Sequence, residues 1–303
     1  MKSKYIAWAI APIFLIGCSD YLETPPSVDY GENEVFATRA DAEKLLTTLY
    51  AEGMPYGFCM SSTNTDRRLL SSSTLASACD EGEDVATWAM GNAAWNAGNH
   101  TNTNFPWDED CRFYLRNHTM RVANLILKRI HEVPFDEGDP DFNKRTTGEA
   151  YFMRAMLLWE GVYRYGGMPI VRDVIDPTDF SQRPRNSFSD CIDSILIDCD
   201  RATQYLPDYY TDNAKLGRAT RIAALALKAR VLLYAASPLF NTSTPYMSFP
   251  GHEDLIGYGN YDRERWKKAA DAAKAAIDAA LASGHYKIHN TGNPDKDYED
   301  VWT

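Results

Sequence analysis

Aromatic rings and amide groups gather in one polar stretch between positions 88 and 107, WAMGNAAWNAGNHTNTNFPW. It carries three of the seven tryptophans, Trp88, Trp95 and Trp107. Five asparagines accompany them: Asn92, Asn96, Asn99, Asn102 and Asn104. Flat aromatic faces suit the axial C–H groups of a pyranose, and asparagine amides donate to and accept from hydroxyl groups. The stretch therefore indicates a carbohydrate-binding site on a loop.

Five residues are the predicted ligand contacts: Arg67, Trp88, Trp95, Asn96 and Asn99. Arg67 lies beside Arg68 in a Ser/Thr-rich stretch, where its guanidinium can hydrogen-bond sugar hydroxyls. A second interpretation stays open, in which Trp88, Trp95 and Trp107 anchor the loop on the neighbouring helices. In that interpretation Arg67 and Arg68 are a solvated pair.

Signals of catalysis or metal binding are weak. Glycosidases hold two carboxylates across a sugar, and among 42 acidic residues no such pair stands out. The acidic run 80–84 lacks the spacing of an EF-hand, and we interpret it as a solvated loop. His285-x-x-x-His289 has the spacing of a zinc-binding helix, but Gly284 ends the helix before it and no glutamate lies between the histidines. The sequence predicts a protein that is not an enzyme and has no metal and no cofactor.

The elements that must position the loop are helices, because apolar residues recur at steps of three and four. Helices are predicted over residues 39–52, 111–132, 147–165, 188–206 and 263–283, and within 217–241. Thr38, Ser187 and Asp262 are the predicted N-caps, and Thr146-x-x-Glu149 is typical of a capping box for the third helix. No helix is predicted after residue 283. The fold class is therefore all-α.

The stretch 217–241, GRATRIAALALKARVLLYAASPLFN, has the clearest period. Its predicted buried stripe consists of Ile222, Leu225, Ala226, Ala229, Leu232, Leu233 and Ala236. Pro238 ends the helix, because the residue before a proline is pushed out of the α region. The small alanines of the stripe favour close packing of this helix on its neighbours.

The third to sixth predicted helices show a weak internal repeat. Arg154 corresponds to Lys228 at a shift of 74 positions. The fourth and sixth predicted helices fit the same shift, which relates position 188 to position 262. Each repeat would be an αα-hairpin that buries its apolar face on the next, as in tetratricopeptide solenoids with long inserted loops.

The N-terminus has the features of an export signal. Residues 1–17 combine Lys2 and Lys4 with an apolar run too short to span a bilayer, and the run ends in Leu-Ile-Gly-Cys18. This pattern predicts a signal peptide that is removed and a lipid anchor on Cys18. Residues 18–31 would be a polar, lipidated tether, and residues 32–303 the helical domain with the ligand loop at 56–110.

Composition excludes one class of partner. The net charge of −11 repels phosphate backbones, so nucleic acid is not an expected partner. Five cysteines remain besides Cys18, an odd number, so they do not form a complete disulfide framework. Cys191 and Cys199 lie about 12 Å apart by helical rise, too far to bridge, whereas a Cys59–Cys79 bridge and free thiols both stay open.

Two segments resemble a known family. The stretch 217–241 and the segment 148–171, GEAYFMRAMLLWEGVYRYGGMPIV, resemble the two characteristic helices of the SusD/RagB family, outer-membrane nutrient-binding lipoproteins of Bacteroidetes. The resemblance implies a decorated tetratricopeptide-like fold, a place on the cell exterior, and ligand contacts partly from the loop region 56–110. Because family members are usually much longer, it also implies that this chain corresponds to their N-terminal part.

The resemblance implies a function in nutrient uptake. The protein would bind oligosaccharide without turnover and deliver it to a SusC-like TonB-dependent outer-membrane transporter. Two alternatives stay open: a binding module for a peptide-derived or other non-glycan nutrient, and a secreted glycan-degrading enzyme.

Overall fold

The computed structural model describes residues 31–54, 113–176 and 178–302. Within these ranges all regular structure is helical, which confirms the predicted all-α class. The longer helices are α2 (Arg39–Gly53), α5 (Phe113–Arg129), α6 (Phe142–Tyr165), α7 (Phe188–Tyr205), α8 (Arg221–Ala236) and α9 (Glu264–Ser283). Shorter ones are α1 (Glu32–Val35), α10 (Pro294–Trp302) and the 3₁₀ turns η4 (Ile130–Glu132), η5 (Asn213–Lys215) and η6 (Glu253–Leu255).

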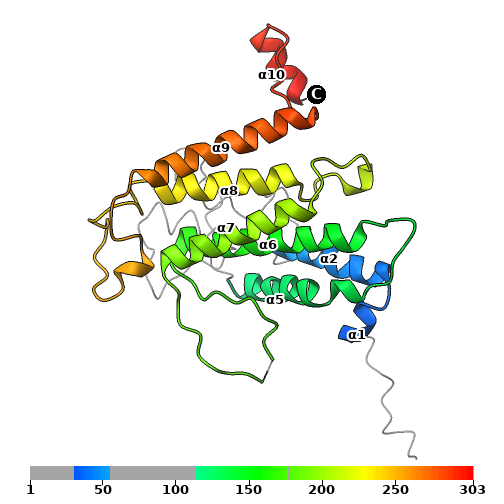
Figure 1. Ribbon diagram of the computed structural model, residues 1–303, viewed down its shortest axis with the longest axis horizontal. Helices are drawn as coiled ribbons and strands as arrows, with labels where there is room; N and C mark the ends of the chain where they lie inside the picture. Colours follow the sequence, from blue (N-terminus) through cyan, green and yellow to red (C-terminus); the bar gives the residue numbers. More distant parts are fainter. Residues whose placement is uncertain (1–30, 55–112, 177, 303) are drawn as a thin grey trace, which may run out of the picture.

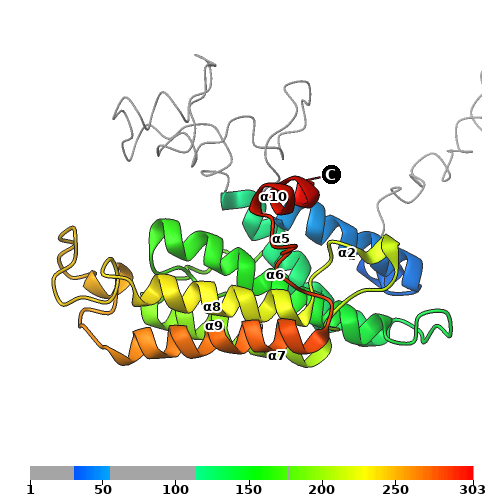
Figure 2. The ribbon, with the colours of Figure 1, turned by 90° about the horizontal axis from the view of Figure 1, so that it is seen from above.

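The long helices stack as hairpins (Figure 1). α6 packs against α7 and α8 against α9, each pair antiparallel, and α7 joins the two pairs by packing on α8. On the other side of α6 lie α5 and α2 (Figure 2). This is the arrangement of αα-hairpins that the sequence repeat predicts.

Two apolar clusters form the core. One lies among α2, α5 and α6 and includes Leu46, Ile126 and Met153. The other lies among α6, α7 and α8, where Phe188 stacks on Phe240 with ring centroids 4.4 Å apart. Because α6 contributes to both clusters, it is the central helix of the described part.

Local signals for the helix ends are largely confirmed. Thr38 Oγ1 accepts from the Asp41 backbone N–H at 3.2 Å, and Ser187 Oγ accepts from that of Asp190 at 3.0 Å. The prediction for α9 is one residue early: Arg263 is the N-cap and makes no side-chain cap bond, although Asp262 accepts from the Glu264 N–H at 2.9 Å. At the other ends, the chain leaves α6 and α9 through glycines with positive φ, Gly166 at 76° and Gly284 at 72°.

The predicted capping box of the third helix is wrong. α6 begins at Phe142, a full turn earlier, so Thr146 and Glu149 are buried inside the helix. The extra turn is stabilised by tertiary contacts, because Phe142 is buried and Arg145 forms two hydrogen bonds to Asp139 at 2.9 and 2.7 Å. A capping motif is local, and these contacts override it.

The predicted stripe of α8 is only partly right. Ile222 and Ala236 are buried, but Ala226 is exposed and Leu233 is 56% exposed. The other buried positions are Ala224, Val231 and Ala235. α8 lies between α7 and α9, so its buried residues are spread over two contact faces, which a single stripe does not describe.

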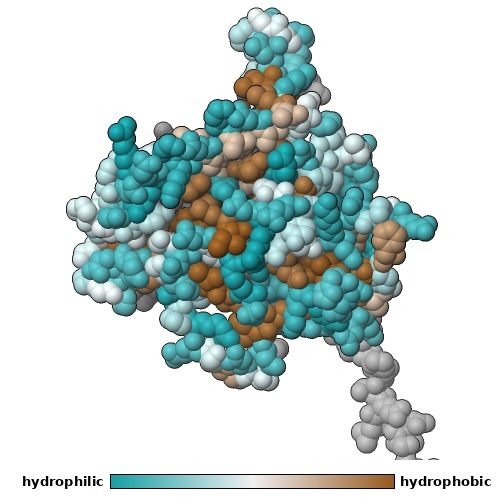
Figure 3. All heavy atoms as spheres, in the orientation of Figure 1, coloured by the Kyte–Doolittle hydropathy of each residue, from teal (hydrophilic) through white to brown (hydrophobic). Residues whose placement is uncertain are grey.

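A further helix, α10, follows α9, contrary to the prediction that no helix comes after residue 283. Pro294 and acidic residues open it, as is favourable at a helix start. α9 itself buries only Ala269. Figure 3 shows apolar surface between polar ridges on the face formed by α7, α8 and α9. Large apolar side chains exposed on α8 and α9 include Leu233, Ile277 and Leu281.

Candidate functional site

The residues predicted to contact ligand lie outside the described residues. This holds for Arg67, Trp88, Trp95, Asn96 and Asn99, and also for the lipidation residue Cys18. Their roles stay predictions. The structure does describe the helices that border the predicted ligand loop, and the cavities of the helical scaffold.

The two helices that flank residues 55–112 in the chain, α2 and α5, contact each other directly. Near the end of α2, Glu52 Oε2 lies 2.9 Å from Nδ1 of His118 in α5. A Cβ on the next residue, Gly53, would lie 2.6 Å from Thr119 Cγ2 and 3.0 Å from Met153 Cε, so only glycine allows this approach of α2 to α5 and α6. The chain therefore leaves for the predicted loop, and returns from it, at one packed pair of helices, the kind of rigid support on which binding loops are usually carried.

One cavity of the described part lies between α5, α6 and the connection from α6 to α7, with a volume of about 510 Å³. Its lining residues are Met120, Arg121, Leu157, Leu158, Met168, Pro169, Val171, Asp173, Ile175 and Arg183. This volume is within the range of ligand pockets. Seven of these lining residues are apolar and three, Arg121, Asp173 and Arg183, are charged, and the described walls lack aromatic rings and amide side chains. Their chemistry suits a ligand that is largely apolar, because no ring is present in these described walls on which a sugar could stack.

Side chains of α5 form hydrogen bonds to the segment 171–175, which lies along the edge of this cavity. Arg121 Nη1 donates to the Ile175 carbonyl at 2.6 Å. Asn124 Nδ2 donates to the carbonyls of Val171 and Asp173 at 3.1 and 3.2 Å. We call residues 171–175 the strap. Because three of its carbonyls are bonded to one helix, the strap has a fixed position on the scaffold.

A second cavity has a different chemistry. It has a volume of about 260 Å³ and lies between the start of α6 and the connection from α7 to α8. Three tyrosines line it with charged residues of both signs: Tyr205, Tyr209, Tyr210, Asp141, Lys144, Arg145, Asp212 and Lys215. Tyr209 stacks on His285, with centroids 4.0 Å apart and planes 8° apart. Rings beside donors and acceptors are the combination that binds hydroxyl-rich ligands. The sequence reasoning missed this tyrosine cavity, although the aromatic density of YLPDYY at 205–210 is a visible signal.

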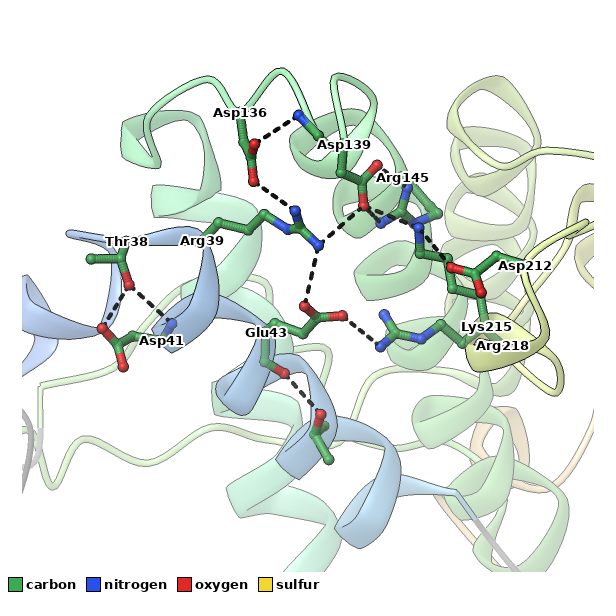
Figure 4. A network of polar contacts seen from close by, with 12 residues as sticks. Thr38, Arg39, Asp41, Glu43, Asp136, Asp139, Arg145, Asp212, Lys215 and Arg218 are labelled. Carbon is green, nitrogen blue, oxygen red and sulfur yellow. Dashed lines mark hydrogen bonds and ion pairs between the residues drawn. The ribbon is translucent and has the colours of Figure 1, made fainter.

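The base of the tyrosine cavity belongs to a network of ion pairs (Figure 4). Asp139 accepts from Arg145 at 2.7 Å and from Lys215 at 3.2 Å, and these cations lower the pKa of its carboxyl to about 2. Arg39 of α2 bonds to Asp136 at 2.6 Å, and Glu43, also of α2, accepts from Arg218 at 3.0 Å. The network joins α2, α6 and η5, so the cavity is built on the tertiary fold.

A buried carboxyl lies one turn along α6 from Arg145. Glu149 is fully buried, 3.5 Å from Arg145 Nε and 3.7 Å from Arg218 Nη1. Burial raises the pKa of Glu149, and the neighbouring Tyr50 hydroxyl and the two guanidiniums lower it only in part. Glu149 has no access to solvent, so it contributes to the charge balance of the core and does not contact ligand.

Metal-ligand clusters of His, Cys, Asp and Glu are absent from the described residues. His285 stacks on Tyr209, whereas His289 faces Asp297 and Asp300 at 3.6 and 3.5 Å, so the two histidines have different surroundings. Cys191 and Cys199 are buried free thiols, as their spacing predicts. In the part of the chain that the structure describes, none of the helices has the length and apolar character needed to cross a bilayer.

Comparison with known proteins decides the family. The model of a SusD-like family described as "starch-binding associating with outer membrane" matches residues 20–233, well over half of the 303 residues. The chain belongs to this SusD-like family. The resemblance of the two helical segments is thereby confirmed, and the description of the family supports glycan binding and association with the outer membrane.

Individual SusD-like relatives agree with this assignment. The SusD-like protein P2 of Formosa agariphila is 25% identical over 230 residues, 75% of this chain and 42% of the relative. The solved structure of BT4246 has a TM-score of 0.66 at 24% identity and covers 88% of this chain and 43% of that one. A laminarin-binding SusD-like protein has a TM-score of 0.52 at 21% identity, with 66% and 41% covered. At these identities the structures show the fold, and they confirm the predicted decorated tetratricopeptide-like helical class. The chain spans about two fifths of the length of these relatives.

Proposed function

We propose that this SusD-like protein captures oligosaccharide at the outer membrane and passes it to a SusC-like TonB-dependent transporter. The observation that carries the proposal is the match of residues 20–233 to a family described as starch-binding. A structural relative with the same fold binds laminarin, which supports a glycan as the class of ligand. Capture is non-covalent, and the protein acts as a binder without turnover.

The binding site of the proposal is the loop at 56–110, with Trp95 as the main stacking platform and Arg67, Trp88, Asn96 and Asn99 around it. Its support is the residue chemistry of the loop together with the packed α2–α5 pair that borders it. The tyrosine cavity is a second place where rings and hydrogen-bonding groups meet. An extended oligosaccharide has several sugar rings, so more than one such surface on the same molecule is consistent with this ligand.

Attachment to the membrane rests on Cys18 in the proposal. An acylated Cys18 followed by the polar stretch 19–31 would hold the helical domain away from the bilayer and on the cell exterior. Mass spectrometry of the mature protein should find a diacylated or triacylated cysteine at its N-terminus. Unchanged membrane association of Cys18→Ala would contradict the lipid anchor.

The test of the function is a titration of the protein against neutral oligosaccharides and against a peptide pool, with product analysis of the same samples. We expect saturable oligosaccharide binding, recovery of the sugar at its original length, and co-purification of a TonB-dependent transporter. Shortened sugar would indicate the glycan-degrading enzyme instead. Binding of peptides alone would indicate a non-glycan nutrient.

A further inference from the structure

A third cavity, of about 390 Å³, lies between α5, α6, α7 and the strap, on the side of the strap that faces Tyr151. Its lining residues are Asn124, Leu127, Lys128, Tyr151, Arg154, Arg172, Asp173, Val174 and Arg201. Four of the nine are cations and one is an acid, in a chain of net charge −11. Such a local excess of positive charge in an acidic protein indicates an anionic ligand.

The base of this cationic cavity carries more positive charge than its acid can balance. Arg154 is buried and bonds to both oxygens of Asp198, at 2.7 and 2.8 Å. Arg172 bonds to the same carboxylate at 3.0 Å. Asp198 is itself buried, so one carboxylate serves two guanidiniums. Arg154 and Arg172 carry two positive charges against the single negative charge of Asp198, so one positive charge at the base of the cavity is not compensated.

The mouth of the cavity adds two exposed cations. Lys128 of α5 and Arg201 of α7 are exposed, and neither has a hydrogen bond or ion pair within the described residues. The Arg201 guanidinium lies 5.5 Å from the ring centroid of Tyr151, and that of Arg154 lies 5.4 Å from it on the same ring. Tyr151 thus places an aromatic ring beside two of the four cations.

The opposing acid does not cancel this charge. Asp173 belongs to the strap, where its backbone carbonyl accepts from Asn124 and its side chain is exposed. Counting Asp173 and Asp198 against Lys128, Arg154, Arg172 and Arg201, the cavity keeps a net charge of +2. Planar guanidiniums bind carboxylate and sulfate oxygens through paired N–H donors.

We propose that the cationic cavity is a second ligand site, which binds an acidic sugar residue bearing a carboxylate or a sulfate ester. Arg201 and Lys128 contact the anionic group, and the Tyr151 ring contacts the apolar face of the sugar. The volume of about 390 Å³ and the overall negative charge of the chain favour a single charged sugar residue over an extended polyanion. The saccharide nature of the ligand rests on the proposed function, whereas its charge rests on the cavity.

The experiment uses the full chain and three probes of equal length: an oligogalacturonate, a sulfated galactose oligosaccharide and a neutral galactose oligosaccharide. The site variant is Lys128→Gln with Arg201→Gln. The control variant, Arg230→Gln with Lys268→Gln, removes the same charge from exposed positions of α8 and α9 that have no hydrogen bond or ion pair in the described part. Calorimetric titration at two salt concentrations gives the affinities.

We expect at least one acidic probe to bind, and the site variant to weaken it by about tenfold or more while the control variant leaves it within about twofold. The preferred acidic probe identifies carboxylate or sulfate as the group that is bound. Equal loss in both variants, or no acidic binding by the wild type, would overturn the inference. Neutral binding should be unchanged in the site variant. If the wild type binds an acidic probe but not the neutral one, the result would count against capture of neutral oligosaccharide and would leave the cationic cavity supported.

Discussion

The two helical hairpins, α6–α7 and α8–α9, share a backbone arrangement but differ in what holds them. Arg154 of α6 and Lys228 of α8 occupy equivalent positions, 74 residues apart, and each pairs with a carboxylate of α7. The Arg154–Asp198 pair is buried, with side chains 6% and 3% exposed. The Lys228–Asp200 pair has side chains 27% and 52% exposed. Equivalent sequence positions therefore carry interactions of different strength, because the first lies in the middle of the stack.

The first helix of one hairpin, α6, and the outer helix of the other, α9, also differ in burial. α6 buries most of its length, including Arg145, Glu149 and Arg154. α9 buries only Ala269, and its exposed side carries pairs such as Lys274–Asp278 at 2.5 Å. The repeat thus preserves the antiparallel pairing of helices, whereas burial determines which side chains contribute to stability. Substitutions at equivalent positions can test this difference.

Asp198→Asn against Asp200→Asn is the comparison with the largest expected effect. Asp198→Asn leaves the buried Arg154 and its neighbour Arg172 without a counter-charge, so the free energy of unfolding should fall by about 3–5 kcal/mol. Asp200→Asn removes a partly exposed pair and should cost less than about 1 kcal/mol. Urea denaturation of both variants measures the difference, and equal losses would contradict the account of the two hairpins.

The next largest difference between the hairpins should be in how well each tolerates a larger side chain. A Cβ on Gly148 of α6 would lie 2.8 Å from Leu206 Cγ and 2.9 Å from Tyr205 Cβ, so Gly148→Ala should destabilise by about 1–3 kcal/mol. Ala273→Leu adds more volume on the exposed part of α9 and should change stability by less than about 0.5 kcal/mol. Thermal melts of the two variants report the outcome. A stabilised Gly148→Ala would show that α6 and α7 can separate slightly without loss.

One part of the pH dependence should come from the ion-pair network at the base of the tyrosine cavity. The lowered pKa of Asp139, about 2, means that between pH 4 and pH 2 the native state binds fewer protons than the unfolded state. The contribution of Asp139 is therefore complete above about pH 4 and is lost as the pH falls towards 2. The stability difference between wild type and Asp139→Asn should shrink by about 1–2 kcal/mol over that range. A difference that stays constant with pH would contradict the role of its ion pairs.

The smallest effect is expected on α9. Lys274→Met removes an exposed pair with Asp278, four positions along the helix, and should lower stability by about 0.3–0.5 kcal/mol at low salt and by less at high salt. Denaturation at two ionic strengths measures it. A cost above 1 kcal/mol would mean that α9 is held more firmly than its exposure indicates.

The sequence predicts the features that depend on neighbouring residues in the chain. The caps at Thr38 and Ser187 and the stop at Gly166 follow from side-chain chemistry within one turn, and the structure confirms them. The start of α6 was mispredicted because Phe142 and Arg145 are stabilised by partners distant from the capping motif.

The sites depend on tertiary contacts to a greater degree. Tyr209 and Lys144 meet only because the α7–α8 connection folds back on α6. Arg172 and Arg154 share Asp198 across three segments of the chain. Residue types alone give no sign of such sharing. Trp95 and its neighbours were proposed from composition, and their role is tested by binding.

The most direct test of the central claim is the oligosaccharide affinity of Trp95→Ala, measured by calorimetry together with its melting temperature. If Trp95 is the stacking platform on a loop carried by the α2–α5 pair, affinity should fall by about 1–3 kcal/mol, on the scale of a lost aromatic hot spot. The melting temperature should stay unchanged, because the helical scaffold is intact. A large drop in melting temperature, with wild-type affinity for the fraction that remains folded, would show that Trp95 supports the fold and does not bind the sugar.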